Sequence, residues 1–143
     1  MLKRTFDIIV SIISIVLSLP IMILIAILIK FTSKGPVFFI QDRIGLNGKY
    51  FKMIKFRTML QNSEKEGTGL FSFKGDPRIT NLGHFLRRTS LDELPQFLNV
   101  LKGEMSIVGP RPHMTDHTKH YSKEVNNFMQ RHKCLPGITG WAQ

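Results

Sequence analysis

The chain opens with a long apolar run and continues as a polar, basic remainder. Residues 8–29 carry no charged side chain, and only three serines and Pro20 interrupt their apolar character. As a helix, these 22 residues would extend about 33 Å, close to the roughly 30 Å of a bilayer's hydrocarbon core. No small-x-small cleavage site follows the run, so we expect it to stay in the protein as a membrane-embedded helix.

The flanking charges leave the topology of this helix open. Basic residues stand on both sides of the run, so both ends have the positive charge of cytoplasmic segments; they are Lys3, Arg4, Lys30 and Lys34. Pro20 lacks the N–H that would bond the carbonyl of Val16, and the Ser18 hydroxyl is placed to bond part of the freed backbone. The pattern suits a kinked spanning helix, which it favours slightly, or a re-entrant helix that returns to the cytoplasmic face.

After the run, short patterned segments predict an α+β, helix-rich fold. Residues 37–41 and 50–57 read as strands, and a glycine-rich turn at residues 45–48 joins them into a β-hairpin. Lys55 and Arg57 share one face of the second strand, and two such cations are most often solvated. Residues 61–69 form a polar segment that we expect to be a mobile loop.

Three further segments predict helices, which we expect to lie along a membrane surface. Residues 79–88 form a short basic helix, and residues 121–133 form a basic amphipathic one. Between them, a helix has either Ser90, in a capping box with Glu93, or Asp92 as its N-cap, and it ends near Gly103. Its apolar stripe is formed by Leu94, Phe97, Leu98 and Leu101.

Composition narrows the class of partner. Lys and Arg total 20 against 10 Asp and Glu, a net charge of +10 that suits a phosphate-rich partner or an anionic membrane surface. Nucleic acid is disfavoured by the long apolar run. The single cysteine, Cys134, excludes an internal disulfide, and the chain has no P-loop, dinucleotide or serine-hydrolase motif.

Acidic and basic side chains meet near the predicted central helix. Asp92 and Glu93 lie at its positive N-terminal end, where acidic residues are usually caps. Arg87 and Arg88 stand just upstream, however, and this combination can collect phosphate, with a carboxylate serving as nucleophile or Mg²⁺ ligand. Arg111 lies between two prolines, and a guanidinium held in a stiff turn suits bidentate phosphate binding.

A histidine pattern further along is a weaker candidate. His113, His117 and His120 have i, i+4, i+7 spacing, with Asp116 between them, which would place three imidazoles on one helical face. A basic solvated face is the favoured interpretation, and a zinc site is the alternative.

Several blocks together resemble the bacterial sugar transferase family, the monotopic polyprenyl-phosphate phosphoglycosyl transferases. They occur in the family's order over nearly the whole chain, and the most specific are Gly35-Pro36-Val37-Phe38-Phe39, Lys55-Phe56-Arg57-Thr58-Met59, Arg87-Arg88-Thr89-Ser90-Leu91-Asp92-Glu93-Leu94-Pro95-Gln96, Gly109-Pro110-Arg111-Pro112 and Pro136-Gly137-Ile138-Thr139-Gly140-Trp141.

The resemblance implies transfer of a sugar-1-phosphate from a UDP-sugar to undecaprenyl phosphate, with release of UMP and a requirement for Mg²⁺. By this resemblance Asp92, with Glu93 as its partner, is the nucleophile and metal-binding residue, and it forms a phosphosugar-aspartyl intermediate. The family's phosphate-contacting cations correspond to Lys55, Arg87 and Arg111. Its membrane helix is re-entrant and breaks at a proline that matches Pro20, near Ser18, which reverses the preference for a spanning helix.

The resemblance also implies a division of the chain. Residues 1–34 would be the membrane-embedded part, and residues 35–143 a catalytic domain on the cytoplasmic face of the bacterial inner membrane. The family continues several dozen residues beyond the position of Gln143, so we expect this catalytic domain to be C-terminally incomplete. The alternative function is a non-catalytic, membrane-bound basic module that binds anionic lipid or phosphorylated partners. Neither the sugar nor the glycan pathway (exopolysaccharide, capsule, O-antigen or glycoprotein) is specified by the residues.

Overall fold

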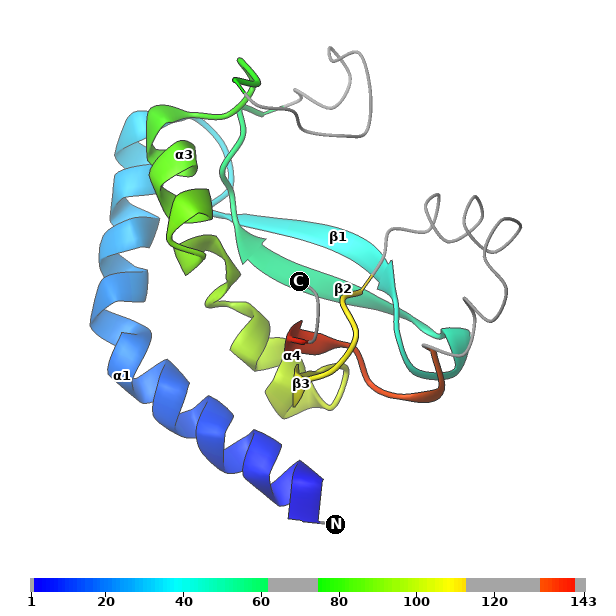
Figure 1. Ribbon diagram of the computed structural model, residues 1–143. Helices are drawn as coiled ribbons and strands as arrows, with labels where there is room; N and C mark the ends of the chain where they lie inside the picture. Colours follow the sequence, from blue (N-terminus) through cyan, green and yellow to red (C-terminus); the bar gives the residue numbers. More distant parts are fainter. Residues whose placement is uncertain (1, 62–74, 113–131, 141–143) are drawn as a thin grey trace.

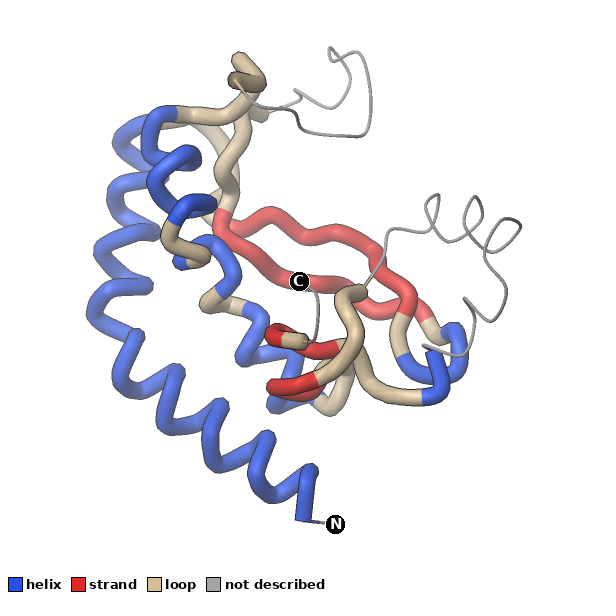
Figure 2. Tube along the Cα trace, in the orientation of Figure 1, coloured by secondary structure: helices blue, strands red, loops and turns tan. Residues whose placement is uncertain are grey.

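The computed structural model describes residues 2–61, 75–112 and 132–140 (Figures 1 and 2). These residues form an α+β, helix-rich fold with a small hairpin, as predicted. The elements in chain order are α1 (Leu2–Thr32), β1 (Phe38–Ile44), η1 (Leu46–Gly48), β2 (Tyr50–Phe56), α3 (Asn81–Arg88), η2 (Leu91–Glu93), α4 (Gln96–Lys102), β3 (Ser106–Val108) and β4 (Gly137–Thr139).

Helix α1 is continuous through Pro20, so the break that the resemblance implies at this residue is not seen. The ribbon bends along its length, and the helix lies along one side of the other elements (Figure 1). The prediction for Ser18 was also wrong in detail, because its hydroxyl donates to the carbonyl of Ser14 at 2.6 Å, not to that of Val16. By length and composition, α1 is the one helix among the described residues that could cross a membrane.

The face of α1 that meets the rest of the protein changes character along the helix. Near the N-terminus it is polar, with Asp7 and Ser11 buried; near the C-terminus it is apolar, with Ile25 and Ile29 buried. Ile25 and Ile29 pack with Phe56 and Leu86 in one core cluster. The opposite face consists of exposed large apolar side chains, among them Phe6, Ile9, Ile13, Val16, Leu17, Ile23, Leu24 and Phe31.

Strands β1 and β2 form the predicted antiparallel hairpin, with Phe38 opposite Phe56 and Ile44 opposite Tyr50. The first strand begins one residue later and ends three residues later than predicted, since the pairing continues through Asp42 and Arg43. The connection is the 3₁₀ turn η1, whose Asn47 has a left-handed backbone with φ 53°. Asparagine tolerates this conformation better than most residues.

Helix α3 confirms the predicted short basic helix, and Thr80 caps it by accepting a 2.9 Å hydrogen bond from the backbone N–H of Gly83. Neither predicted N-cap of the following helix was right. Ser90 is left-handed at φ 57° and makes no side-chain cap, while Asp92 lies in the separate 3₁₀ turn η2. Helix α4 begins only after Pro95, which has no backbone N–H to donate.

The predicted apolar stripe is only partly buried: Leu94, just before α4, packs against the core cluster of Ile25, Ile29, Phe56 and Leu86, but no stripe residue is among the buried residues of α4. The buried residues are Gln96, Asn99 and Val100, whereas Leu98 is exposed. Asn99 turns toward the hairpin, where its amide accepts from the backbone N–H of Ile54 and donates to the carbonyl of Lys52. A polar side chain therefore occupies the centre of this packing because it completes the hydrogen bonding of β2.

A two-stranded parallel pairing of β3 with β4 brings residues 132–140 back to the hairpin and α4. Ser106 lies opposite Gly137, and Val108 lies opposite Thr139. Ile107 and Ile138, one from each strand, pack against the second core cluster, formed by Phe51, Met53, Val100 and Met105.

Several predictions fall outside the described residues. They concern the loop at 61–69 beyond Gln61, the histidines His113, His117 and His120 with Asp116, and the helix predicted at 121–133 before His132.

Candidate active site

Asp92 is a buried carboxylate, with 9% of its surface exposed, and the charge of Lys55 on the hairpin acts on it. It lies in the middle of η2, a turn that the left-handed Ser90 begins and that runs into Pro95 and α4. Burial raises the pKa of Asp92, the nearby charge of Glu93 adds to this effect, and Lys55 and Arg87 oppose it. A carboxylate with a raised pKa is more basic and hence a better nucleophile once it is ionised.

Glu93, next to Asp92 on η2, pairs with Lys55 of β2 and lies near Arg111. Lys55 on β2 donates a 2.5 Å hydrogen bond to Oε1 of Glu93, and Nη2 of Arg111 lies 4.0 Å from the same oxygen. Lys55 is thus held by an ion pair and is not a free, solvated cation, so the favoured reading of this residue was wrong. The prediction that Arg57, two residues further along, is solvated was also wrong. Arg57 is buried and donates to the carbonyls of Ser33 and Lys34.

Arg87 approaches Asp92 from the end of α3. Its Nε donates a 2.9 Å hydrogen bond to Oγ1 of Thr58, just beyond β2, which fixes the base of the guanidinium. Its positive charge lowers the pKa of Asp92 and also that of Asp76. The bidentate partner of Asp76 is Arg78, and this pairing lowers the pKa of Asp76 to about 2.

A shallow depression of about 240 Å³, open to solvent, lies beside this cluster. Its lining comes from both hairpin strands, η2, α4, the segment 111–112 and β4, and consists of Arg43, Met53, Lys55, Glu93, Gln96, Arg111, Pro112, Gly137 and Ile138. Among the sequence-predicted site residues, Lys55, Glu93 and Arg111 line it. Asp92 and Arg87 do not line it; Asp92 is under the electrostatic influence of the lining residues Lys55 and Glu93 and of Arg87.

Arg43 is a lining residue that the sequence analysis missed. It lies on β1 opposite Phe51, and alternation along the two strands places it on the same face as Lys55. The strand register could have revealed Arg43 as a neighbour of Lys55, but the predicted first strand ended at residue 41, before Arg43.

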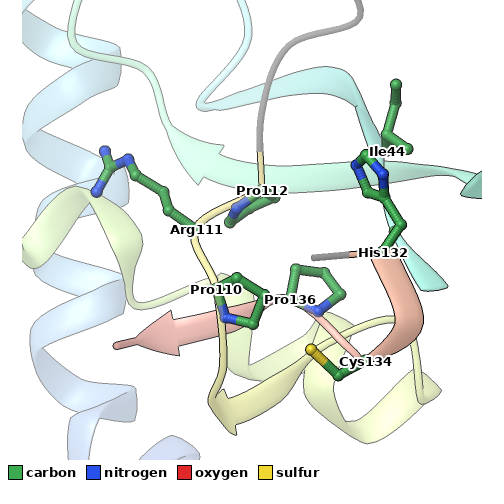
Figure 3. A pocket seen from close by; sticks show the side chains of 8 residues that line it. Ile44, Pro110, Arg111, Pro112, His132, Cys134 and Pro136 are labelled. Carbon is green, nitrogen blue, oxygen red and sulfur yellow. The ribbon is translucent and has the colours of Figure 1, made fainter. Parts of the chain in front are cut away.

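Arg111 lies between this depression and a second one of about 190 Å³. Figure 3 shows its guanidinium pointing away from His132 and Cys134, which stand at the opposite side of the second depression. Pro110, Pro112 and Pro136 form the walls between them (Figure 3). Between its two flanking prolines, Arg111 lies in a segment without regular secondary structure, and its side chain is 54% exposed.

The metal-binding capacity of the site rests on few protein ligands. Among the described residues there is no group of three His, Cys, Asp or Glu side chains that could hold a metal ion. Asp92 and Glu93 offer adjacent carboxylates, and Mg²⁺ is commonly held by one or two carboxylates together with substrate phosphate oxygens. This donor set therefore fits Mg²⁺ in the presence of a phosphate substrate. Ser18 hydrogen-bonds within α1 and is not part of the cluster.

Comparison with known proteins gives consistent matches over the whole chain. The family model described as "Bacterial sugar transferase" matches residues 1–143. A UDP-glucose:undecaprenyl-phosphate glucose-1-phosphate transferase of Xanthomonas campestris pv. campestris is 53% identical over 141 residues, which are 99% of this chain and 29% of the relative. A UDP-N-acetylgalactosamine-undecaprenyl-phosphate N-acetylgalactosaminephosphotransferase of Aeromonas hydrophila is 46% identical over 142 residues, 99% of this chain and 33% of the relative.

The share of each relative that is matched differs. This chain spans 29% and 33% of those two proteins, so most of their length has no counterpart in it. An exopolysaccharide production protein PSS of Rhizobium leguminosarum bv. phaseoli is 46% identical over 145 residues, and there the match covers 99% of this chain and 72% of the relative.

Proposed function

The chain belongs to the bacterial sugar transferase family, and we propose that it transfers a sugar-1-phosphate from a UDP-sugar to undecaprenyl phosphate. The products are UMP and an undecaprenyl-diphospho-sugar. The observation that carries this proposal is the buried carboxylate of Asp92 set between the charges of Lys55 and Arg87, beside a depression with three cationic side chains. The names of relatives that act on UDP-sugars and undecaprenyl phosphate support it.

In the proposed first half-reaction, an oxygen of the Asp92 carboxylate forms a bond to the phosphorus that carries the sugar. The bond from that phosphorus to the bridging oxygen breaks, and UMP leaves with the electron pair. In the second half, an oxygen of undecaprenyl phosphate forms a bond to the same phosphorus and Asp92 leaves as a carboxylate. The cations Lys55, Arg87 and Arg111 bind and orient the phosphates and balance their charge, which is the main requirement of phosphoryl transfer.

We further propose Mg²⁺ as the cofactor, held by Asp92 together with phosphate oxygens of the donor. When bound, the ion would neutralise part of the diphosphate's charge. Glu93 contributes differently: its pairing with Lys55 places the ammonium within reach of Asp92's charge. Because Glu93 neutralises part of the charge of Lys55, it limits the positive charge beside Asp92 before the substrate binds.

Both ends of α1 are tied to the same globular part, which bears on membrane topology. At the N-terminal end, Arg4 donates to the carbonyls of Val100 and Leu101 at 2.6 and 2.9 Å. At the other end, Arg57 donates to the carbonyl of Ser33 at 2.9 Å. A helix that crossed the bilayer would separate these two ends by the thickness of the membrane.

We therefore propose that α1 enters and leaves the membrane on one face, with its exposed apolar side in the lipid. We propose that this face is the cytoplasmic side of the inner membrane, and the basic residues that flank the apolar run support this. Labelling of a cysteine added at residue 2 tests the topology: reagent confined to the periplasm should leave it unmodified, and labelling would contradict the proposal.

The chemistry is tested by the intact mass of the purified protein after incubation with Mg²⁺ and a panel of UDP-sugars, without lipid acceptor. We expect a mass increase of one sugar phosphate that is absent in Asp92→Asn and is removed by adding undecaprenyl phosphate. UMP release that persists in Asp92→Asn would overturn Asp92 as nucleophile. Absence of both adduct and UMP release in the folded protein, with salt-sensitive binding to anionic liposomes, would favour the non-catalytic basic module instead.

A further inference from the structure

The charge balance of the depression beside Asp92 is uneven. Its lining brings together three cationic side chains, Arg43, Lys55 and Arg111, and one carboxylate, that of Glu93. Glu93 already accepts the hydrogen bond from Lys55. Nη2 of Arg111 lies 4.0 Å from the same carboxylate oxygen, so three cations share one carboxylate around this solvent-open depression, and its lining carries a net positive charge.

Arg43 is held in this position from two sides. Its Nη2 donates a 2.7 Å hydrogen bond to Oε1 of Gln41, two residues back on β1, and its Nη1 donates to the carbonyl of Pro112 at 3.3 Å. Its Nε is buried and has no hydrogen-bond partner among the described residues. The two hydrogen bonds made by Nη1 and Nη2 hold the guanidinium at the lining of the depression.

The neighbouring cation makes this placement less favourable without a ligand. Burial, with the nearby positive charge of Arg111, lowers the pKa of Arg43 to about 10, while Glu93 acts in the opposite direction. Arg43 is still charged at neutral pH. The like charges of Arg43 on β1 and Arg111 in the segment 111–112 repel each other, and an anion that binds between them reduces this repulsion.

We propose that Arg43 is a further phosphate-binding residue, and that the depression lined by Arg43, Lys55 and Arg111 takes a phosphate monoester. The inference rests on the proposed function for the source of that group. In the proposed reaction two molecules carry a phosphate monoester: UMP as it leaves and undecaprenyl phosphate as it arrives. A guanidinium presents several N–H donors in one plane, which suits two oxygens of one phosphate, and an ammonium cannot match this geometry.

The test measures binding, so it does not depend on turnover. UMP, inorganic phosphate and a short-chain polyprenyl phosphate are each titrated calorimetrically into the full chain in detergent, at low and at high salt. For Arg43→Gln we expect the dissociation constant of at least one of the two monoesters to rise about tenfold, the loss of one charge-assisted contact. The salt dependence of binding should become shallower at the same time.

Lys52→Gln is the matched control, because Lys52 belongs to the same hairpin, is exposed, and lies on the face opposite to Lys55. It removes the same charge from the chain, and we expect it to change each dissociation constant less than twofold. A weakened affinity for UMP alone assigns the subsite to the leaving nucleotide, and a weakened affinity for the polyprenyl phosphate alone assigns it to the acceptor.

A purely structural role for Arg43, as a tie between β1 and Pro112, predicts a different result. The melting temperature would fall in Arg43→Gln while the folded fraction bound every phosphate as tightly as the parent, and that outcome overturns the proposal. If Arg43→Gln does not fold, Arg43→Lys preserves the charge but lacks the planar guanidinium, and a phosphate affinity equal to that of the parent would then overturn it. Binding is measurable in Asp92→Asn as well, so failure of the aspartyl chemistry and failure of this subsite are distinguishable.

Discussion

Lys55 donates a 2.5 Å hydrogen bond to Oε1 of Glu93, and this pair joins strand β2 to the turn that carries Asp92. The two partners act on Asp92 in opposite directions: the charge of Lys55 lowers the pKa of Asp92, and the charge of Glu93 raises it. The acid–base behaviour of the site is therefore adjustable from either side by single substitutions.

The first prediction concerns the acid limb of the pH profile for UMP release. Asp92 must be ionised to attack, so activity is lost as pH falls through its pKa. We expect Lys55→Met to move the acid limb to higher pH and Glu93→Gln to move it to lower pH, with kcat/KM in Lys55→Met also reduced on the order of 10²-fold. Lys52→Gln, on the opposite face of the hairpin, should move neither. Shifts of both variants in the same direction would show that the two side chains do not act on Asp92 through their charges.

The second prediction separates activity from stability at Asp92. Burial is the largest cause of the raised pKa of this carboxyl in the folded protein. A group whose pKa is raised on folding stabilises the folded state at pH values below its unfolded pKa, and this contribution is lost as pH rises through the folded pKa. At neutral pH the ionised carboxylate is therefore a net cost to folding.

We expect Asp92→Asn to reduce UMP release by a factor on the order of 10⁴ and to raise the melting temperature at pH 7 by a few degrees. The gain in melting temperature should shrink as the pH is lowered, because the parent's Asp92 becomes neutral. Thermal unfolding in detergent at several pH values measures this. A variant that is less stable than the parent at pH 7 would contradict the burial argument.

The third prediction concerns how α1 is fastened. Oδ1 of Asp7 accepts hydrogen bonds from Oγ of Ser106 at 3.1 Å and from the backbone N–H of Ile107 at 3.0 Å. Asp7→Leu leaves both donors buried without an acceptor, and we expect it to lower the free energy of unfolding by about 1–3 kcal/mol. Asp7→Asn keeps one acceptor oxygen and should lose less.

The control for Asp7 is Ile9→Leu, which changes an exposed apolar side chain on the same helix and should leave stability unchanged. Thermal unfolding in detergent measures both variants, and limited proteolysis between residues 32 and 38 reports whether α1 has loosened from the domain. Equal melting temperatures for Asp7→Leu and the parent would mean that the hydrogen bonds of Arg4 and the apolar contacts of Ile25 and Ile29 are enough to hold the helix in place.

The features predicted best from the sequence are those set by local pattern. The apolar run of α1, the alternation of the hairpin and the basic helix α3 each follow from residues close together in the chain. The candidate site residues were identified by short motifs and by the family resemblance. The structure places Lys55, Glu93 and Arg111 around one depression, and the charges of Lys55, Glu93 and Arg87 act on Asp92.

What the sequence did not reveal depends on contacts between distant segments or on an unusual backbone. Ser90 reads as a helix cap, yet it adopts a left-handed conformation that begins η2. Asn99 reads as a polar position of a surface helix, yet it is buried because it bonds the backbone of β2, 45 and 47 residues earlier in the chain. Arg43 joins the site only through strand register, which a pattern of apolar positions does not fix at a polar strand end.

The fourth prediction concerns the contact that sets Arg87 in place. Gly83 lies on α3 where the helix crosses the backbone of Thr58, and a Cβ at this position would come within 2.1 Å of the Thr58 carbonyl oxygen. Alanine is the better helix former by about 1 kcal/mol, but here the neighbouring atom is backbone and has little freedom to move. We therefore expect Gly83→Ala to lower the free energy of unfolding by about 1–3 kcal/mol.

The same substitution should reduce activity, because the guanidinium of Arg87 is hydrogen-bonded to Thr58 and its charge acts on Asp92. A displaced α3 would lengthen that hydrogen bond and move the positive charge away from the carboxylate, so the acid limb of UMP release should shift to higher pH as in Lys55→Met. His84→Ala, an exposed change on the same helix, is the control and should alter stability by no more than about 0.5 kcal/mol. If Gly83→Ala proved destabilised yet kept the parent's pH profile, the packing of α3 would matter for folding alone, and the orientation of Arg87 would have to come from Thr58 without help from the helix.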